Sequence, residues 1–207
     1  MSSWLWLRFR LSSRTRLPKR RKNWAWSITP SFLECHEHKH HEQISVLRYS
    51  RMDDQLIELC GMHRLSESLL GAGLEVAFPA RDRGVDLIAY ADVDHGLGRF
   101  VAAPIQMKAA TSACFSIDKK YSKFHDILIA YVWNVSEPAN TQIYVLTQPE
   151  AVDLATEMKY TATESWIGKG VYVVTHPSRQ LVERLRSHEA SRTRWEEKIL
   201  RVGGMRL

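Results

Sequence analysis

The sequence predicts an α/β protein with a central mixed sheet of about five strands flanked by helices. Three observations lead to this prediction. A helical pattern precedes several short strand-like runs, a second helical pattern separates the later runs, and a third lies near the end of the chain. The 207 residues include 44% hydrophobic and 25% charged residues, an ordinary composition for a globular domain.

The first predicted element is an amphipathic helix over about residues 56–70. Gly71 and Gly73 are expected to end it, because glycine adopts left-handed conformations at little cost. A half-buried strand should follow over 74–78, where apolar residues alternate with Glu75. The apolar helix stripe consists of Leu56, Ile57, Leu59, Cys60, Met62, Leu65, Leu69 and Leu70.

A β-hairpin is predicted next. Two apolar runs, residues 84–90 and 103–108, are separated by a turn-favouring segment over 92–98 that is rich in Asp and Gly. Strand-like runs follow at 127–133 and 143–147, then a helical pattern at 148–158 that has Pro149 in its first turn.

A late strand is expected at 171–175, and a helical pattern runs from 177 to about 199. Arginines in this closing segment occur together with several glutamates. We interpret it first as a solvated helix and second as a DNA-contacting one.

Polar residues in the hairpin form the first candidate site. Asp86 lies near the start of the first strand, and Gln106 and Lys108 lie near the end of the second. Residues two apart on a strand point to the same face, so Gln106 and Lys108 should project together, close to Asp86. An acid, an amide oxygen and an amine in one place suit a divalent metal and an activated water.

This arrangement resembles the PD-(D/E)xK nuclease superfamily in its Gln variant, with Asp86 followed by Gln106-Met107-Lys108. The similarity covers about residues 53–190 and is closest to small, stand-alone members of the Holliday-junction-resolvase-like branch, many of them uncharacterised. It implies a restriction-endonuclease-like fold and Mg²⁺- or Mn²⁺-dependent hydrolysis of DNA. The metal would be held by Asp86, the Gln106 oxygen, the Met107 backbone carbonyl and a substrate phosphate, while Lys108 would orient the attacking water or stabilise the transition state.

The resemblance is incomplete at the first helix, where many relatives carry a further metal-binding Glu. Glu67 and Glu58 are the candidates here, and neither has the expected spacing from Gly73. Asp82 is a rival to Asp86 as the acid. These departures keep open a second interpretation, a catalytically inactive nuclease-like module that binds nucleic acid or protein.

A basic segment follows the second hairpin strand, in a stretch over 115–121 that resembles the one after the QxK strand in related proteins. Lys119, Lys120 and Lys123 are candidate nucleic-acid contacts, although such lysines can equally serve as a solvated surface. Tyr121 is expected to pack or to stack.

Residues 1–51 form a separate basic leader, and residues 52–207 form the predicted nuclease-like domain with its C-terminal helix. Residues 1–33 hold eight Lys and Arg and no acid, so the other 174 residues hold 21 basic and 23 acidic side chains. The leader is interpreted as a nucleic-acid-binding arm, a targeting sequence or an over-long gene start that precedes Met52.

The leader also contains His36-Glu37-His38-Lys39-His40, which matches the H-E-x-x-H signature of zinc proteases. Pro30 is nearby and no apolar helix face accompanies the tract, so we interpret it as a polar segment or a loose metal binder.

The composition also bears on the setting of the protein. No stretch reaches the 18 or more apolar residues of a membrane span, so we expect no membrane partner. The three cysteines form no CxxC motif, which favours a reducing, cytoplasmic environment. DNA is the expected partner, and a homodimer would suit the cutting of both strands.

Overall fold

The computed structural model describes residues 52–81, 83–91, 100–124 and 126–203. The leader over 1–51 with its His-rich tract, the rival acid Asp82 and the expected turn over 92–98 lie outside these residues.

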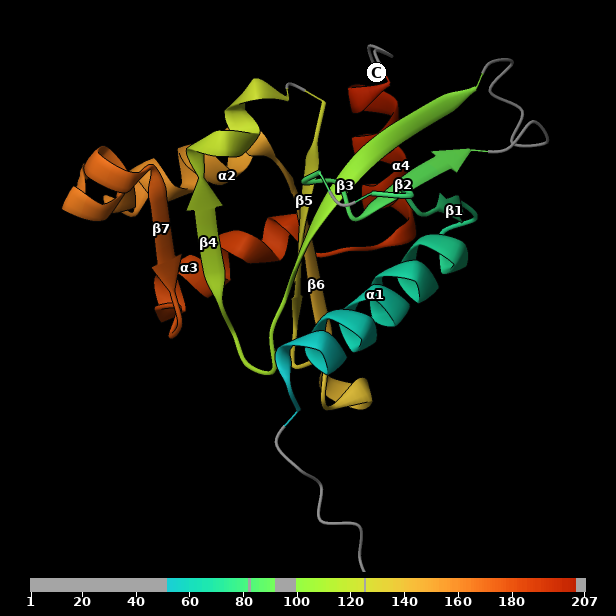
Figure 1. Cartoon of the computed structure of the whole chain (residues 1–207), viewed down its shortest axis with the longest axis horizontal. Helices are drawn as coiled ribbons and strands as arrows, with labels where there is room; N and C mark the ends of the chain where they lie inside the picture. Colours follow the sequence, from blue (N-terminus) through green and yellow to red (C-terminus); the bar gives the residue numbers. More distant parts are fainter. Residues whose placement is uncertain (1–51, 82, 92–99, 125, 204–207) are drawn as a thin grey trace, which may run out of the picture. The chain divides into compact units, whose positions relative to one another are not determined.

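The predicted central sheet is confirmed. Its five strands lie in the order β1-β2-β3-β5-β6 and form a mixed sheet, since β3 and β5 are parallel and the other neighbours are antiparallel (Figure 1). The strands are β1 (Glu75–Ala77), β2 (Leu87–Ala91), β3 (Val101–Ala109), β5 (Leu128–Trp133) and β6 (Gln142–Thr147). All six residues of β5 are buried, as expected for a central strand covered on both faces.

A second, two-stranded sheet stands apart from the first. The late strand expected from the sequence forms as β7 (Val171–Val174), but it pairs with β4 (Phe115–Asp118) in antiparallel register. Phe115 lies opposite Val174 and Asp118 lies opposite Val171. The segment after the QxK strand is therefore fixed by a partner more than 50 residues away in the sequence.

The described part of the chain contains four α-helices, and none of its helices is both long enough and apolar enough to cross a bilayer. Short helical turns connect several elements. The α-helices are α1 (Asp54–Gly71), α2 (Gln148–Glu157), α3 (Arg179–Leu185) and α4 (Arg192–Val202). The turns are η2 (Lys119–Lys123), η3 (Pro138–Asn140), η4 (Tyr160–Ala162), η5 (Ser165–Lys169) and η6 (Arg186–His188).

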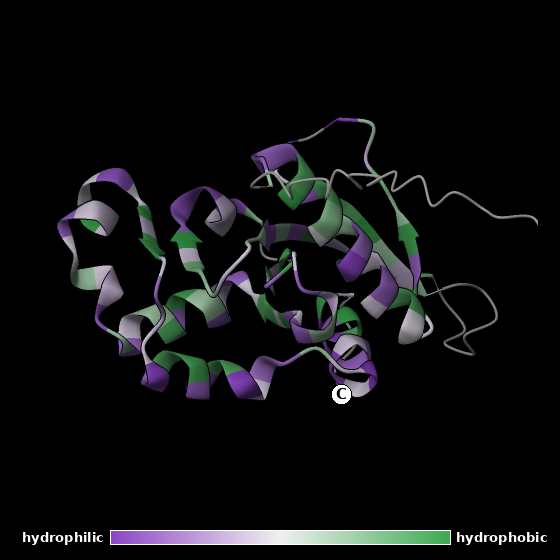
Figure 2. Ribbon diagram, turned by 90° about the horizontal axis from the view of Figure 1, so that it is seen from below, coloured by the Kyte–Doolittle hydropathy of each residue, from purple (hydrophilic) through white to green (hydrophobic). Residues whose placement is uncertain are grey.

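The helices cover both faces of the central sheet. On one face, Leu65 of α1 and Trp195 of α4 belong to one buried cluster, and the Trp195 indole donates a hydrogen bond to Ser68 Oγ at 2.9 Å. On the other face, Ala151 of α2 and Leu181 of α3 belong to a second cluster. Figure 2 shows green and purple residues alternating along the helices, as expected for helices with one apolar face.

The closing segment forms two helices, so the expectation of one continuous helix over 177–199 is wrong. Between α3 and α4 the chain runs beside β6, where Glu189 bridges Tyr144 and the Ala190 N–H donates to the Ile143 carbonyl at 2.8 Å. Ser191 then caps α4. A helix cannot supply these sheet-type hydrogen bonds, so it ends before this point and restarts after it.

Four arginines of this closing segment are paired with acids on the protein surface, as the solvated-helix interpretation expects. The pairs are Arg184–Glu157, Arg186–Glu183, Arg192–Glu196 and Arg194–Glu197.

The first helix and strand form where the sequence predicts them, but several of their apolar residues face solvent, including Leu56, Leu59 and Leu70 of the predicted helix stripe. Helix α1 continues through Gly71, and Gly73 is the residue with left-handed geometry, at φ 83°. Strand β1 ends at Ala77, so the predicted place of Phe78 on the strand is wrong, and its side chain is 60% exposed. This edge strand is too short to carry Phe78 onto the sheet.

Candidate active site

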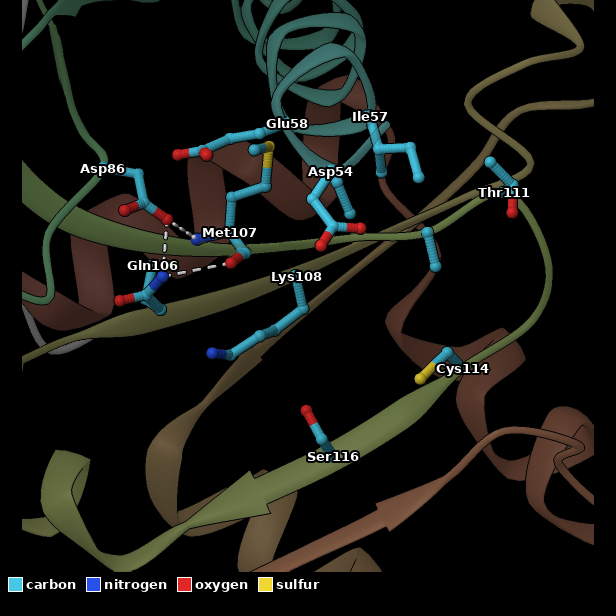
Figure 3. A pocket seen from close by; sticks show the side chains of 12 residues that line it. Asp54, Ile57, Glu58, Asp86, Gln106, Met107, Lys108, Thr111, Cys114 and Ser116 are labelled. Carbon is cyan, nitrogen blue, oxygen red and sulfur yellow. Dashed lines mark hydrogen bonds between the residues drawn. The ribbon is translucent and has the colours of Figure 1, made fainter. Parts of the chain in front are cut away.

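An open pocket of about 470 Å³ lies where α1 faces the end of β3 (Figure 3). It brings together residues from α1, from the position just before β2, from β3, from the connection between β3 and β4, and from β4. Its lining residues are Asp54, Ile57, Glu58, Asp86, Gln106, Met107, Lys108, Ala109, Ala110, Thr111, Cys114 and Ser116. Asp86, Gln106 and Lys108, the three residues that the sequence singled out, therefore share one pocket.

The hairpin register places Asp86 beside the QxK segment. The β2–β3 pairing ends with Leu87 opposite Ile105, and the Asp86 N–H donates to the Ile105 carbonyl at 2.9 Å. Oδ2 of Asp86 accepts hydrogen bonds from the Met107 N–H at 2.6 Å and from Nε2 of Gln106 at 2.5 Å. The carboxylate thus joins the start of one strand to the end of the next.

The amide of Gln106 lies at the centre of this group. The residue is only 8% exposed, and its Nε2 also donates to the Met107 carbonyl at 3.0 Å. Two oxygens, one from Asp86 and one from Met107, are therefore directed at a single nitrogen (Figure 3). A polar side chain this deeply buried needs such partners.

Lys108 extends from the same strand into the middle of the pocket. Its Nζ donates a hydrogen bond to the Tyr121 hydroxyl at 3.2 Å and lies 5.1 Å from the centre of the Tyr121 ring. The Lys108 side chain is half-buried. It shares the pocket with the Asp86 carboxylate and has the Tyr121 phenol as its neighbour.

Two acids of α1 complete the pocket. Asp54 and Glu58 are four residues apart and so lie on one helix face, and Figure 3 shows Glu58 extending toward the Asp86 end. The close approach of α1 depends on Gly61. A Cβ at that position would lie 2.5 Å from Ala109 Cβ, so only glycine lets the helix pack this tightly on β3.

Glu67, expected as a further metal ligand, lies elsewhere. Its side chain is 75% exposed and pairs with Arg64 at 3.3 Å, three residues earlier on α1. Glu58, the other candidate, lines the pocket instead. The sequence analysis offered both residues, neither at the expected spacing from Gly73, whereas the i, i+4 pair of Asp54 and Glu58 at the start of the helix was a signal that favours Glu58.

The three lysines after β4 lie on η2 and do not belong to the pocket lining. Lys119 lies over the Trp166 ring, 5.1 Å from its centre, while Lys120 pairs with Asp118 at 3.4 Å. Lys123 is exposed. The expected role of these lysines in binding nucleic acid stays a prediction.

The far end of the pocket carries groups that the sequence analysis did not single out. These groups are Thr111, Cys114 and Ser116. Their position shortly after the QxK segment in the sequence could have predicted that they lie at the pocket. Burial raises the pKa of the Cys114 thiol, and the nearby charge of Lys108 offsets this rise only in part. Cys114 is therefore a neutral thiol at pH 7.

The pocket offers oxygen ligands of the kind that Mg²⁺ and Mn²⁺ prefer. Among the described residues, no three His, Cys, Asp or Glu side chains form a metal-binding group by themselves. The Asp86 carboxylate and the Met107 carbonyl nevertheless converge on the Gln106 amide, which presents an oxygen if it turns over. These donors fit a hard cation that also keeps waters or binds a phosphate.

Comparisons with known proteins add little to this geometry. No family model matches the chain, and no curated protein matches it. A solved structure of a bacterial homing endonuclease, I-Ssp6803I, aligns with 74% of this chain and 96% of its own, at 18% sequence identity and a TM-score of 0.39. Because this likeness is too distant to bear on function, we base the proposed function on the pocket.

Proposed function

We propose that the protein is a metal-dependent nuclease that hydrolyses phosphodiester bonds in DNA. The observation that carries this proposal is the convergence of the Asp86 carboxylate and the Met107 carbonyl on the Gln106 amide, with the Lys108 ammonium in the same pocket. Carboxylates, an amide oxygen and an ammonium group in one open pocket can bind a divalent cation and support the hydrolysis of a phosphodiester.

Asp86, the Met107 carbonyl and the Gln106 oxygen would hold Mg²⁺ or Mn²⁺, and Glu58 is the nearest further acid on α1. A bound divalent cation would supply charge neutralisation at the phosphate and a lowered pKa of the attacking water. Three protein oxygens leave room for waters and for a phosphate oxygen, which suits Mg²⁺ because this ion gives up its water ligands reluctantly.

Lys108 would hold the attacking water or donate hydrogen bonds to the phosphate oxygens as negative charge develops on them. Its half-buried position strengthens such contacts, because charges interact more strongly away from bulk water. The exposed lysines of η2 would contact phosphates further along the strand, and salt would weaken this part of the binding.

The test uses Asp86→Asn in the full chain. Asparagine still accepts a hydrogen bond from the Met107 N–H, so the fold should survive while the charge that would hold the metal is lost. We expect Mg²⁺- or Mn²⁺-dependent cleavage of plasmid and junction DNA to fall on the order of a hundredfold or more, together with the calorimetric heat of metal binding.

The matched control is Glu67→Gln, which also removes one carboxylate but from an exposed position outside the pocket lining. It should cleave as the unchanged protein does. If Asp86→Asn cleaved DNA as fast as the unchanged protein, the assignment would be wrong, because the activity would not need the carboxylate proposed to hold the metal.

A non-catalytic module that binds nucleic acid or protein is the second candidate. Two observations favour it: Gln106 is neutral, and its NH₂ group occupies the place between Asp86 and Met107. DNA binding without turnover in either Mg²⁺ or Mn²⁺, and with no heat of metal binding, would establish this alternative.

A further inference from the structure

We propose that Tyr121 is a positioning residue that holds the ammonium group of Lys108 in the pocket. The catalytic consequence rests on the proposed nuclease function, whereas the placement of Lys108 can be measured without any activity. Tyr121 is absent from the pocket lining, so it would act through Lys108 and not on the substrate.

The contact involves both parts of the tyrosine side chain. Nζ of Lys108 donates to the Tyr121 hydroxyl at 3.2 Å and lies 5.1 Å from the ring centre, within the range of a cation–π contact. Tyr121 is only 3% exposed, although the other residues of η2 are exposed. Burying one residue of an otherwise solvated turn directs its phenol inward, beneath the lysine.

The small second sheet fixes the turn that carries Tyr121. The Asp118 carboxylate caps η2 by accepting from the Lys120 N–H at 2.8 Å, and the Lys119 N–H donates to the Gly170 carbonyl at 2.8 Å, beside β7. Gln148, at the start of α2, donates to the Asp118 carbonyl at 3.1 Å. Strands β4 and β7 thus have a clear structural role, which is to place one phenol against the end of β3.

Gly84 links the same phenol to the other site residues. Its φ of 87° lies in the left-handed region, and a Cβ there would lie 3.5 Å from Tyr121 Cε1 and 3.9 Å from the Gln106 amide oxygen. The turn that leads into Asp86 therefore lies beside Tyr121 and Gln106 together. One tyrosine borders the positions of the proposed water-holding and metal-holding groups.

A free lysine side chain samples many rotamers, and a residue that fixes its end increases the fraction of molecules ready to react. Removing such a residue should slow the chemical step without weakening substrate binding, because Lys108 would still carry its charge. The expected signature is a lower kcat at an unchanged KM.

The test compares Tyr121→Phe with Tyr131→Phe in the full chain. Both variants delete one buried tyrosine hydroxyl from the same cluster, but the Tyr131 hydroxyl bonds to the Ser116 carbonyl at 2.7 Å. Tyr121→Phe should lower kcat about ten- to a hundredfold at constant KM, the effect of one hydrogen bond to a charged group. Tyr131→Phe should leave the ratio of kcat to KM close to that of the unchanged protein.

A second measurement is independent of cleavage. In NMR spectra of protein labelled with ¹³C on lysine, an immobilised Lys108 should show two distinct Hε signals, which are assigned by their loss in Lys108→Arg. These two signals should merge in Tyr121→Phe and stay separate in Tyr131→Phe. Merging would support the placement even if no DNA were cut, in which case the proposed nuclease function alone would fail. Merged Lys108 signals in the unchanged protein, or signals unaltered by Tyr121→Phe, would overturn the inference.

Discussion

Replacing Gln106 by glutamate probes the proposed metal site most directly. In the unchanged protein, Nε2 of Gln106 donates to Asp86 Oδ2 and to the Met107 carbonyl, so it stands where a cation would meet these two oxygens. Binding a metal therefore requires the amide to turn over and give up both hydrogen bonds. Glutamate has no such hydrogen bonds to lose and adds a charge.

The magnitude follows from the two contacts. A hydrogen bond to a carboxylate contributes about 1.5–3 kcal/mol and one to a carbonyl about 0.5–1.5 kcal/mol, so the pair contributes roughly 2–4 kcal/mol. Metal binding in Gln106→Glu avoids this cost, which corresponds to an affinity on the order of thirty- to a thousandfold higher. Without metal, the same loss should lower Tm by roughly 4–16 °C.

The assay combines a calorimetric titration of Mg²⁺ and Mn²⁺ with thermal unfolding in the presence and absence of metal. Two facing carboxylates raise each other's pKa, so the deficit in stability should be small at low pH, where one carries a proton, and should grow as pH rises. Added metal should then restore Tm. Gln180→Glu, on the exposed start of α3, makes the same charge change as a control. Unchanged metal affinity together with a metal-independent Tm would refute the site.

Two further predictions concern stability. Glu150→Ala should lower the free energy of unfolding by about 3–5 kcal/mol, because Lys198 is 1% exposed and loses its partner, whereas Lys198→Met should cost less because Arg201 still pairs with Glu150 at 2.9 Å. Burial raises the pKa of Glu150, but hydrogen bonds from Lys198 and a backbone N–H outweigh it and lower the pKa from 4.5. The stabilisation is therefore present above about pH 4.5 and lost as pH falls through the lowered pKa, so urea unfolding between pH 7 and 3 should bring the unchanged protein toward Glu150→Ala. Gly84→Ala should cost about 1–2 kcal/mol through its positive φ, while Gly71→Ala, where a Cβ meets nothing within 4 Å, should be neutral or stabilising by urea unfolding.

The elements that the sequence predicted well are those defined by local pattern. The two apolar runs on either side of the Asp- and Gly-rich segment predicted the hairpin, and its register brings Asp86 beside Gln106. Thr147 and Glu150 form a capping box at the start of α2, close to the predicted position. In each case the residues that determine the structure are neighbours in the sequence.

The features that were missed depend on contacts between distant residues. The residues near position 189 do not indicate that the helix ends there and that the chain pairs with β6. The sequence of β4 likewise does not indicate that β7 is its partner. The sequence left Glu58 and Glu67 as alternatives, and the choice between them depends on packing, because Gly61 lets α1 approach β3 and Glu58 lines the pocket there. The contact between Lys108 and Tyr121 likewise depends on the second sheet.

Asp86 also has a structural task, which bears on how its variants are interpreted. The β2–β3 ladder ends at Leu87, and beyond that end the Asp86 carboxylate accepts a hydrogen bond from the Met107 N–H. Each hydrogen bond shown requires only a lone pair, which an asparagine offers as well, and a half-buried carboxylate costs more to desolvate than an amide. These two hydrogen bonds can therefore persist in Asp86→Asn, so the variant separates the role of the residue in the fold from its proposed role as a metal ligand. A stable Asp86→Asn protein without metal heat would agree with this reasoning, whereas a loss of several kcal/mol in stability would make the charge part of the fold itself.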